Sequence, residues 1–352
     1  MVDFDNTPLN STPFGNMLSS YPYFSGLPLR TKIIYWSISA FGLISNVFVI
    51  VVILLYVPMR KQLINTFIIN QSVIDAAAAA MLCLTALVNG EGKRFTTGNI
   101  GDEILCRVLY STALLWAMLV TSAYGMVVMT FEKFIAIVYP ILYKNSFGDK
   151  EVVVKLMLTV PWLIFPLYNV CLNIPTSGIN SEGVCIALAF WPSQAVRNGV
   201  AIFVLVVDYF VPLFSLIFCY ARMAVVLHRR VEPSQDAANQ GEARRNETMA
   251  RARGNVIKTL ALVGVLYCIC WTPNTFYLLL NLFGYPYAKL EGDFYTFTVY
   301  MVFLNCCLNP VIYILKYNQF QAGIRHLLKR ITIPIAKTVV TSSLHSEASY
   351  NA

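Results

Sequence analysis

The sequence predicts an all-α membrane protein, a bundle of seven transmembrane helices followed by a short amphipathic helix on the membrane surface. Two observations predict this fold class. The chain is 57% hydrophobic and only 12% charged, with a mean hydropathy of +0.61, whereas a soluble domain carries roughly 25% charged residues. It also contains seven long apolar runs, each near the roughly 20 residues that a helix needs to span a bilayer.

The apolar runs follow one another from residue 33 onwards, and short polar segments separate them. They lie at about residues 33–57, 66–89, 104–131, 153–174, 199–227, 256–283 and 294–315. The hydrocarbon core of a bilayer holds no water that could bond to the backbone, and a helix satisfies its backbone hydrogen bonds internally. We therefore predict a seven-helix domain at 31–316 after an N-terminal segment at 1–30. An amphipathic helix at 317–332 and a tail at 333–352 follow it, and the polar segment 229–250 is predicted to be a loop.

The basic residues predict the orientation of the bundle. With the C-terminus in the cytoplasm, 19 of the 26 Lys and Arg residues lie on the inner side and 7 on the outer side. This bias follows the positive-inside rule, so we expect an extracellular N-terminus in the plasma membrane. Residues 1–29 lack a basic start followed by an apolar stretch, so the first span is expected to act as the targeting signal. Asn10 then begins a glycosylation sequon on the outer side.

An amphipathic pattern follows the seventh run. Its apolar positions fall on one helical face, and basic residues surround them, which suits a helix lying on the lipids of the inner leaflet. An amphipathic helix without a role at the lipid is the alternative. The apolar positions are Phe320, Ile324, Leu327 and Leu328. The tail beyond them is rich in Ser and Thr, which on phosphorylation can recruit a partner.

Two carboxylates fall inside the apolar runs, Asp75 in the second and Asp208 in the fifth. An ionised side chain at the bilayer centre costs about 2.5–3.5 kcal/mol, so each requires a partner or a function. Polar residues in the first, third and seventh runs can surround Asp75 together with a small cation. A water-filled polar network without an ion is the alternative. These polar residues are Asn46, Ser122, Asn305 and Asn309.

Six of the seven runs carry residues that form a recognisable set. In chain order they are Asn46, Asp75, Trp162, Pro212, Tyr220, Cys270-Trp271-Thr272-Pro273 and Asn309-Pro310-Val311-Ile312-Tyr313. Each motif alone is weak, but the whole set, in this order over about residues 30–330, resembles the rhodopsin-like, class A G-protein-coupled receptors. This resemblance covers the seven-helix domain and implies a membrane receptor.

The resemblance implies roles for several residues. Asp75, Ser122, Asn305 and Asn309 would form the family's sodium pocket, and we expect no other cofactor. Trp271 would lie beneath the ligand and move on activation, although simple core packing also explains a buried tryptophan. Pro273 would kink the sixth helix so that its inner end can swing. Tyr220 and Tyr313, the latter following Pro310, would meet near the cytoplasmic end in the active state.

Two further features come from comparison with the family pattern. Cys106 and Cys185 resemble the pair that ties the third helix to the second outer loop. Cys106 lies 27 residues before Lys133, two more than in many family members, so we expect the top of the third helix to differ. The family's acidic-Arg-Tyr triplet is replaced by Glu132-Lys133-Phe134. Lysine keeps the charge but lacks the planar fork of arginine, which predicts weaker or altered G-protein coupling.

Three positions in the sequence bear on the chemical class of the ligand. The position that binds retinal in opsins is Phe303, and the aspartate typical of biogenic amine receptors is replaced by Leu115. Asp208 would face the pocket and hold a cationic group of the ligand. A carboxylate that is protonated or bonded to a neighbouring helix is the alternative. The predicted lining is completed by Trp116, Tyr209, Trp271, Asn274 and Tyr277.

These observations predict a receptor that binds an extracellular ligand and activates heterotrimeric G proteins by opening its cytoplasmic side. Aromatic residues in the outer loops favour a peptide ligand, although they also serve as interfacial anchors. A transporter or channel with Asp75 and Asp208 in an ion path is the alternative function.

We expect no enzyme, because no nucleophile and base pair is evident. The net charge of +8 indicates no nucleic-acid partner, because the basic residues are scattered between apolar runs, and no cysteine spacing predicts a metal site.

Overall fold

The computed structural model describes residues 28–88, 94–147, 151–188, 190–231, 240–288 and 292–330. Within these ranges, seven helices are long and apolar enough to cross a membrane. The prediction of seven spans is therefore confirmed. They are Leu29–Leu55, Leu63–Val88, Ile100–Val138, Glu151–Thr176, Gln194–Leu227, Ile257–Leu282 and Asp293–Lys316.

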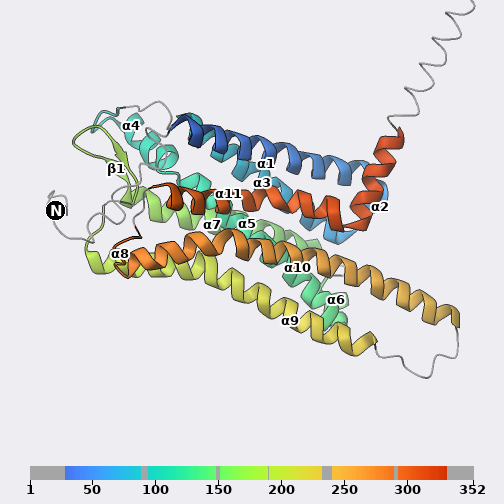
Figure 1. The fold of residues 1–352 in the computed structure, drawn as a ribbon. Helices are drawn as coiled ribbons and strands as arrows, with labels where there is room; N and C mark the ends of the chain where they lie inside the picture. Colours follow the sequence, from blue (N-terminus) through green and yellow to red (C-terminus); the bar gives the residue numbers. More distant parts are fainter. Residues whose placement is uncertain are drawn as a thin grey trace, which may run out of the picture.

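The spans run side by side in a bundle (Figure 1). Five of them each lie in one long helix, namely α1 (Leu29–Leu55), α3 (Leu63–Val88), α7 (Glu151–Thr176), α10 (Gln240–Leu282) and α11 (Asp293–Lys316). The third is composed of α4 (Ile100–Leu105), the π-helical turn η2 (Cys106–Tyr110) and α5 (Ala113–Val138). The fifth is composed of α8 (Gln194–Leu205), the π-helical turn η3 (Val206–Phe210) and α9 (Val211–Val231). Short helices α2 (Val57–Arg60) and α6 (Pro140–Phe147) lie at one end of the bundle.

The helix that carries the sixth span begins earlier than the sequence analysis predicted. Residues 229–250 were expected to form a loop, but α9 continues to Val231 and α10 begins at Gln240. The loop prediction is therefore wrong at both ends. The first turns of α10 contain Ala243, Arg244, Arg245 and Glu247, which are good helix formers.

The third span is interrupted near its start. The turn η2 has π-helical hydrogen bonding, and Thr112 then adopts a left-handed backbone with φ 62°. The hydroxyl oxygen of Ser111 accepts a hydrogen bond from the backbone N–H of Ala113 at 3.3 Å, so the helix restarts with a side-chain partner. This interruption lies within the 27 residues that separate Cys106 from Lys133.

Burial is greatest in the third and seventh spans, where 61% of the most apolar window is buried, and least in the fourth, with 11%. The helix α5 contacts α3, α7, α9, α10 and α11 and so occupies the centre of the bundle. Large apolar side chains on the outer surface, such as Ile44 at 69% exposure and Leu163 at 64%, face away from the bundle. In water such a surface would be an aggregation liability, but in lipid it is the surface that the solvent requires.

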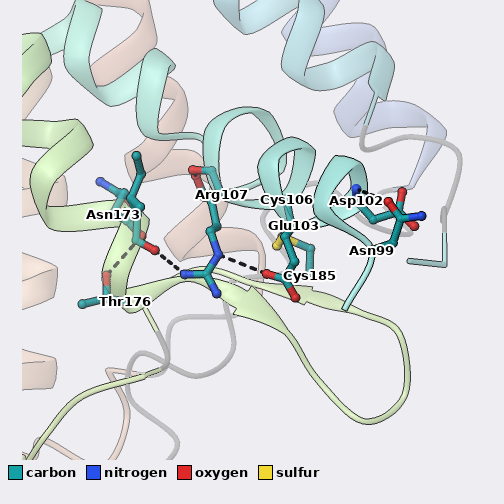
Figure 2. A network of polar contacts seen from close by, with 10 residues as sticks. Asn99, Asp102, Glu103, Cys106, Arg107, Asn173, Thr176 and Cys185 are labelled. Atoms are coloured by element: carbon teal, nitrogen blue, oxygen red, sulfur yellow. Dashed lines mark hydrogen bonds and ion pairs between the residues drawn. A yellow bond between two sulfur atoms is a disulfide. The ribbon is translucent and has the colours of Figure 1, made fainter. Parts of the chain in front are cut away.

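One end of the bundle is closed by a β-hairpin, and we call it the disulfide end. Strand β1 (Gly178–Ile179) pairs antiparallel with β2 (Cys185–Ile186). Cys185 is bonded to Cys106, which confirms the predicted disulfide. The next residue, Arg107, donates from Nη1 to the Ile174 carbonyl at 2.5 Å and from Nε to Glu103 at 3.0 Å. Figure 2 shows that the disulfide and Arg107 together join the third span, the hairpin and the end of α7.

A helix over residues 318–330 follows the seventh span at the opposite end, which we call the α6 end. Its face toward the bundle is anchored by Phe320, which is fully buried and contacts the Phe48 ring edge-on. Ile324 and Leu327 are half-buried against the core, whereas Leu328 is 56% exposed. The predicted amphipathic helix is thus present. Its apolar residues divide between the bundle and the outer surface.

Candidate functional site

A cavity of about 170 Å³ lies between the spans at the disulfide end. Of the six residues predicted to contact a ligand, five line it, namely Trp116, Asp208, Tyr209, Trp271 and Asn274. Tyr277 is instead buried against the rings of Phe294 and Tyr295, with centroids 5.6 Å away. Its predicted place in the lining is corrected accordingly. Tyr277 thus packs on the first turn of α11.

The carboxylate of Asp208 is the main charged feature of the cavity floor. Its Oδ1 atom is buried and makes no hydrogen bond of good geometry among the residues that the structure describes, and its polar neighbour is the Tyr168 hydroxyl. Asp208 lies within η3, where the wider π turn redirects the backbone carbonyls. Two of these carbonyls are taken by tyrosines, Val207 O by Tyr124 at 2.8 Å and Asp208 O by Tyr267 at 3.1 Å. The backbone of the turn is thus held, and the carboxylate lies beside Tyr168 without a cationic partner among the described residues.

Hydrogen bonds also fix the other walls of the cavity. The hydroxyls of Tyr209 and Thr272 lie 2.6 Å apart, and Thr272 donates to the Cys268 carbonyl at 2.5 Å. Tyr209 must therefore donate to Thr272, since the single hydroxyl proton of the threonine is already used. Asn274 donates to Thr298 of α11 at 3.1 Å. These bonds join η3 and α11 to α10, the helix that carries Trp271.

Trp271 occupies the base of the cavity. Its side chain is only 4% exposed, its ring centroid lies 5.6 Å from that of Tyr267, and its Nε1–H is buried without an acceptor among the described residues. An indole N–H usually finds a partner when it is buried. A ligand that enters the cavity or a water molecule can supply that acceptor.

A second polar centre lies deeper in the bundle, around Asp75. Oδ1 accepts hydrogen bonds from Ser122 Oγ at 2.5 Å and from Gln71 Nε2 at 3.1 Å, and Oδ2 accepts one from Asn309 Nδ2 at 2.8 Å. Asn305 is buried nearby in α11, although no hydrogen bond joins these two described side chains. The structure therefore brings together three of the four residues predicted for this pocket and adds Gln71, which the sequence analysis did not single out.

A third cluster lies at the α6 end. Glu132 is fully buried and pairs with Lys133, with Oε2 and Nζ 3.1 Å apart. The hydroxyl of Tyr143 in α6 donates to Glu132 Oε1 at 2.6 Å. Burial and this hydrogen bond raise the pKa of Tyr143 well above its usual value, so the phenol keeps its proton. Phe134 is buried beside Met223 of α9.

Two tyrosines near this cluster were expected to meet only in an active state. Tyr220 donates to the Leu260 carbonyl at 2.7 Å and lies 2.9 Å from the Thr130 hydroxyl. Tyr313 is fully buried, and its hydroxyl has no hydrogen-bond partner within the described ranges. Tyr220 therefore binds α5 and α10, and it is not bonded to Tyr313. Pro273 and Pro310 lie inside α10 and α11 as expected.

Comparison with known proteins decides the family. The family model described as 7 transmembrane receptor (rhodopsin family) matches residues 45–313, which is more than half of the chain. The chain belongs to the rhodopsin family of receptors. The match includes every marker residue from Asn46 to Tyr313, and the receptor is a multi-pass membrane protein and not an enzyme.

Individual relatives are more distant. Galanin receptor 2a of Danio rerio is 22% identical over 297 residues, which is 84% of this receptor and 76% of the relative. Somatostatin receptor type 5 of Rattus norvegicus is 24% identical over 299 residues, 84% and 77% of the two chains. Melatonin receptor type 1A of Mus musculus is 24% identical over 313 residues, 84% and 80% of the two chains. The receptor is thus aligned with these proteins over nearly its whole bundle.

Several residues of the receptor were not found by sequence reasoning. Gln71 carried a usable signal, because it lies one helical turn before Asp75 in an otherwise apolar helix. Arg197, which lines the cavity and is only 6% exposed, was counted only as an outer basic residue. Tyr143 and Tyr267 gave no pattern, since their roles depend on contacts between elements. Asn10 and the tail beyond 330 lie outside the described residues.

Proposed function

We propose that this receptor binds an extracellular peptide in the cavity at the disulfide end and activates heterotrimeric G proteins at the α6 end. In this proposal the N-terminus is extracellular and the protein resides in the plasma membrane, with arrestin as a further partner of its tail. A disulfide forms in an oxidising compartment, which favours placing the Cys106–Cys185 end outside the cell.

The buried carboxylate of Asp208 is the observation that carries the proposed binding mode. A cationic group of the ligand, such as an amine or a guanidinium, would supply the partner that Oδ1 lacks. The cavity provides apolar walls and aromatic faces for the rest of the ligand, including Trp116 and Trp191. Pockets with a few fixed polar groups among apolar walls are typical of ligand sites.

A peptide is favoured because two relatives are named for galanin and somatostatin, and because the segment after the hairpin contributes Ala187 and Leu188 to the cavity lining. The name of the melatonin receptor makes a small molecule the second candidate. Both classes of ligand would contact the same residues at the floor of the cavity, so a single assay can compare them.

Signal transfer to a G protein would pass through the cluster at the α6 end. An extracellular ligand that contacts Trp271 can shift the balance between two packings of α10, because Tyr209 and Asn274 connect that helix to its neighbours. The inner end of α10 would then move away from Lys133. The lysine keeps a positive charge there but makes fewer directed bonds than arginine.

The test uses cells that express the full receptor together with reporters for several G-protein classes. Libraries of cationic peptides and of small amines are applied, and active compounds are retested on Asp208→Asn. We expect this variant to lose potency at least about tenfold, the effect of about 1.4 kcal/mol, with unchanged surface expression. Asp293→Asn is the matched control, because Asp293 lies at the same end but is 83% exposed.

Two outcomes would count against the proposal. Equal potency on Asp208→Asn would remove this carboxylate from the binding site. Uptake of a labelled substrate or ion flux without any G-protein response would favour the alternative of a transporter or channel with Asp75 and Asp208 in an ion path.

A further inference from the structure

The amide nitrogen of Gln71 lies where the oxygens of the Asp75 pocket converge. Three oxygens surround Nε2, namely Ser122 Oγ at 2.8 Å, Asp75 Oδ1 at 3.1 Å and the Ser122 carbonyl at 3.2 Å. An oxygen in this position would face a carboxylate and a carbonyl, which are acceptors only. The chemistry of the neighbours therefore fixes the orientation of the amide, with the nitrogen toward Asp75.

Gly125 of α5 provides the space for this side chain. A Cβ atom added to Gly125 would collide with Gln71 Oε1 and would lie 3.1 Å from Ile74 Cδ1. No other residue type leaves that space, because glycine alone has no Cβ. The amide of Gln71 thus fills a gap between α3 and α5 that exists only because residue 125 is glycine.

The residues around Asp75 do not fit a sodium ion in this arrangement. A hard cation is bound by several oxygen ligands that direct lone pairs toward it. Here the Asp75 carboxylate accepts three hydrogen bonds, from Gln71, Ser122 and Asn309. The oxygens of Asp75 and Ser122 that would coordinate an ion converge instead on an N–H donor.

We propose that the amide of Gln71 is a built-in substitute for the cation, so that the stability and conformation of this receptor do not respond to sodium. Gln71, Asp75 and Ser122 are all at most 1% exposed. The amide is part of a side chain, so it cannot leave this buried pocket for the solvent as a bound ion can. The pocket joins α3 and α5, and Asn309 extends it to α11. The same helices that a bound ion would hold together are joined by a covalently attached group.

The test measures thermal unfolding of the purified full-length receptor in nanodiscs, with sodium chloride or choline chloride at equal ionic strength. It needs no ligand, so its result is independent of the proposed function. For the native chain we expect no sodium-specific change in Tm. Gln71→Leu removes the amide and opens space beside Asp75, and its Tm should rise in sodium by at least about 2 °C.

Control variants connect that rise to the pocket. The double variant Gln71→Leu/Asp75→Asn should lose the sodium response, because the carboxylate that attracts the ion is neutral. Gly125→Ala should displace the native amide and create a sodium response without any change at Gln71. Gly199→Ala is the matched control for Gly125→Ala, since a Cβ at Gly199 meets no atom within 4 Å.

Either of two results overturns the proposal. A sodium-specific rise in Tm of the native receptor that Asp75→Asn abolishes would show that the ion binds despite Gln71. Failure of both Gln71→Leu and Gly125→Ala to gain a sodium response would show that the amide does not stand in for a cation. If one of the two variants does not fold, the other one decides.

Discussion

Tyr143 donates a 2.6 Å hydrogen bond to Glu132, the buried carboxylate that also pairs with Lys133 at 3.1 Å. The short helix α6 is thereby attached to the end of α5 that carries Glu132. Glu132 has no solvent exposure, whereas the side chain of Lys133 is 18% exposed. The phenol is therefore a second partner for a carboxylate that lysine alone holds with little directional constraint.

Tyr143→Phe should release this attachment. A hydrogen bond to a charged group contributes about 1.5–3 kcal/mol, so we expect lower thermal stability and higher basal G-protein activation. Thermal unfolding and nucleotide exchange on a co-expressed G protein measure the two effects. Tyr139→Phe is a suitable control, since Tyr139 is 48% exposed. Equal basal activity in native and Tyr143→Phe receptors would show that this bond does not restrain the inactive state.

The contribution of Tyr143 should not depend on pH in the physiological range. Its pKa is raised in the folded state, so its stabilising effect is fully present below the unfolded value of about 10. That effect is lost only as the pH rises through the higher folded value. The stability difference between native and Tyr143→Phe receptors should thus stay constant from about pH 6 to 9. Measuring both Tm values across that range checks the expectation, and a steady decline toward pH 9 would contradict it.

Lys133→Arg should strengthen or redirect G-protein coupling. The guanidinium can hold Glu132 and donate to a bound partner at the same time, which the ammonium of lysine does less well. The measurement is agonist-stimulated and basal signalling at equal surface expression, across several G-protein classes. Lys144→Arg is the control, because Lys144 lies at the same end of the bundle and its side chain is exposed on α6. Unchanged signalling in the Lys133→Arg receptor would refute the idea that lysine limits coupling.

Tyr267→Phe should weaken the floor of the cavity. The hydroxyl of Tyr267 holds the Asp208 carbonyl in the π turn at 3.1 Å, and an ordinary hydrogen bond contributes about 1 kcal/mol. We expect a lower Tm and a ligand affinity reduced by a few fold, because the position of Asp208 becomes less fixed. Tyr287→Phe, at an exposed position, should change neither. A Tm for Tyr267→Phe equal to the native value would mean that the turn is held without this bond.

Thr112→Gly should be tolerated or should stabilise the receptor. A β-branched residue with φ 62° is strained by about 1–3 kcal/mol, and glycine removes that strain. The opposite result is expected for Ser111→Gly, because Ser111 has an ordinary helical backbone and its oxygen accepts from Ala113. The two Tm values should therefore move apart. If Thr112→Gly were the more damaging change, the left-handed turn would not be a source of strain.

The sequence was sufficient for the fold because hydrophobic length and charge placement decide the number of membrane spans. The disulfide was also predicted, because the family resemblance singled out Cys106 and Cys185. The distribution of basic residues among the loops then placed both cysteines on one side of the membrane. Helix ends were less certain. The start of α10 at Gln240 was missed because the segment is polar, and polarity alone does not distinguish a loop from a helix outside the membrane.

The interior of the site was only partly predictable. Asp208 and Trp271 stood out because charge and a motif mark them, whereas Tyr277 was misplaced because the rotation of α10 depends on its packing against α11. The π turn η3 leaves no local signature, although it decides that Asp208 lies on the cavity floor. Gln71 shows the same limit. Its spacing from Asp75 was visible, but its contact with Ser122 required the approach of α5 at Gly125.

The cavity wall that includes Ala187, Leu188 and Trp191 is restrained at two points. The Cys106–Cys185 bond precedes it, and within it the Phe190 N–H donates to the Thr176 carbonyl at 3.0 Å. A segment restrained in this way has already lost conformational entropy during folding. The binding free energy of a ligand that docks against it is therefore not reduced by ordering the segment. The lifetime of a complex should therefore depend on the redox state of a bond that the ligand never touches.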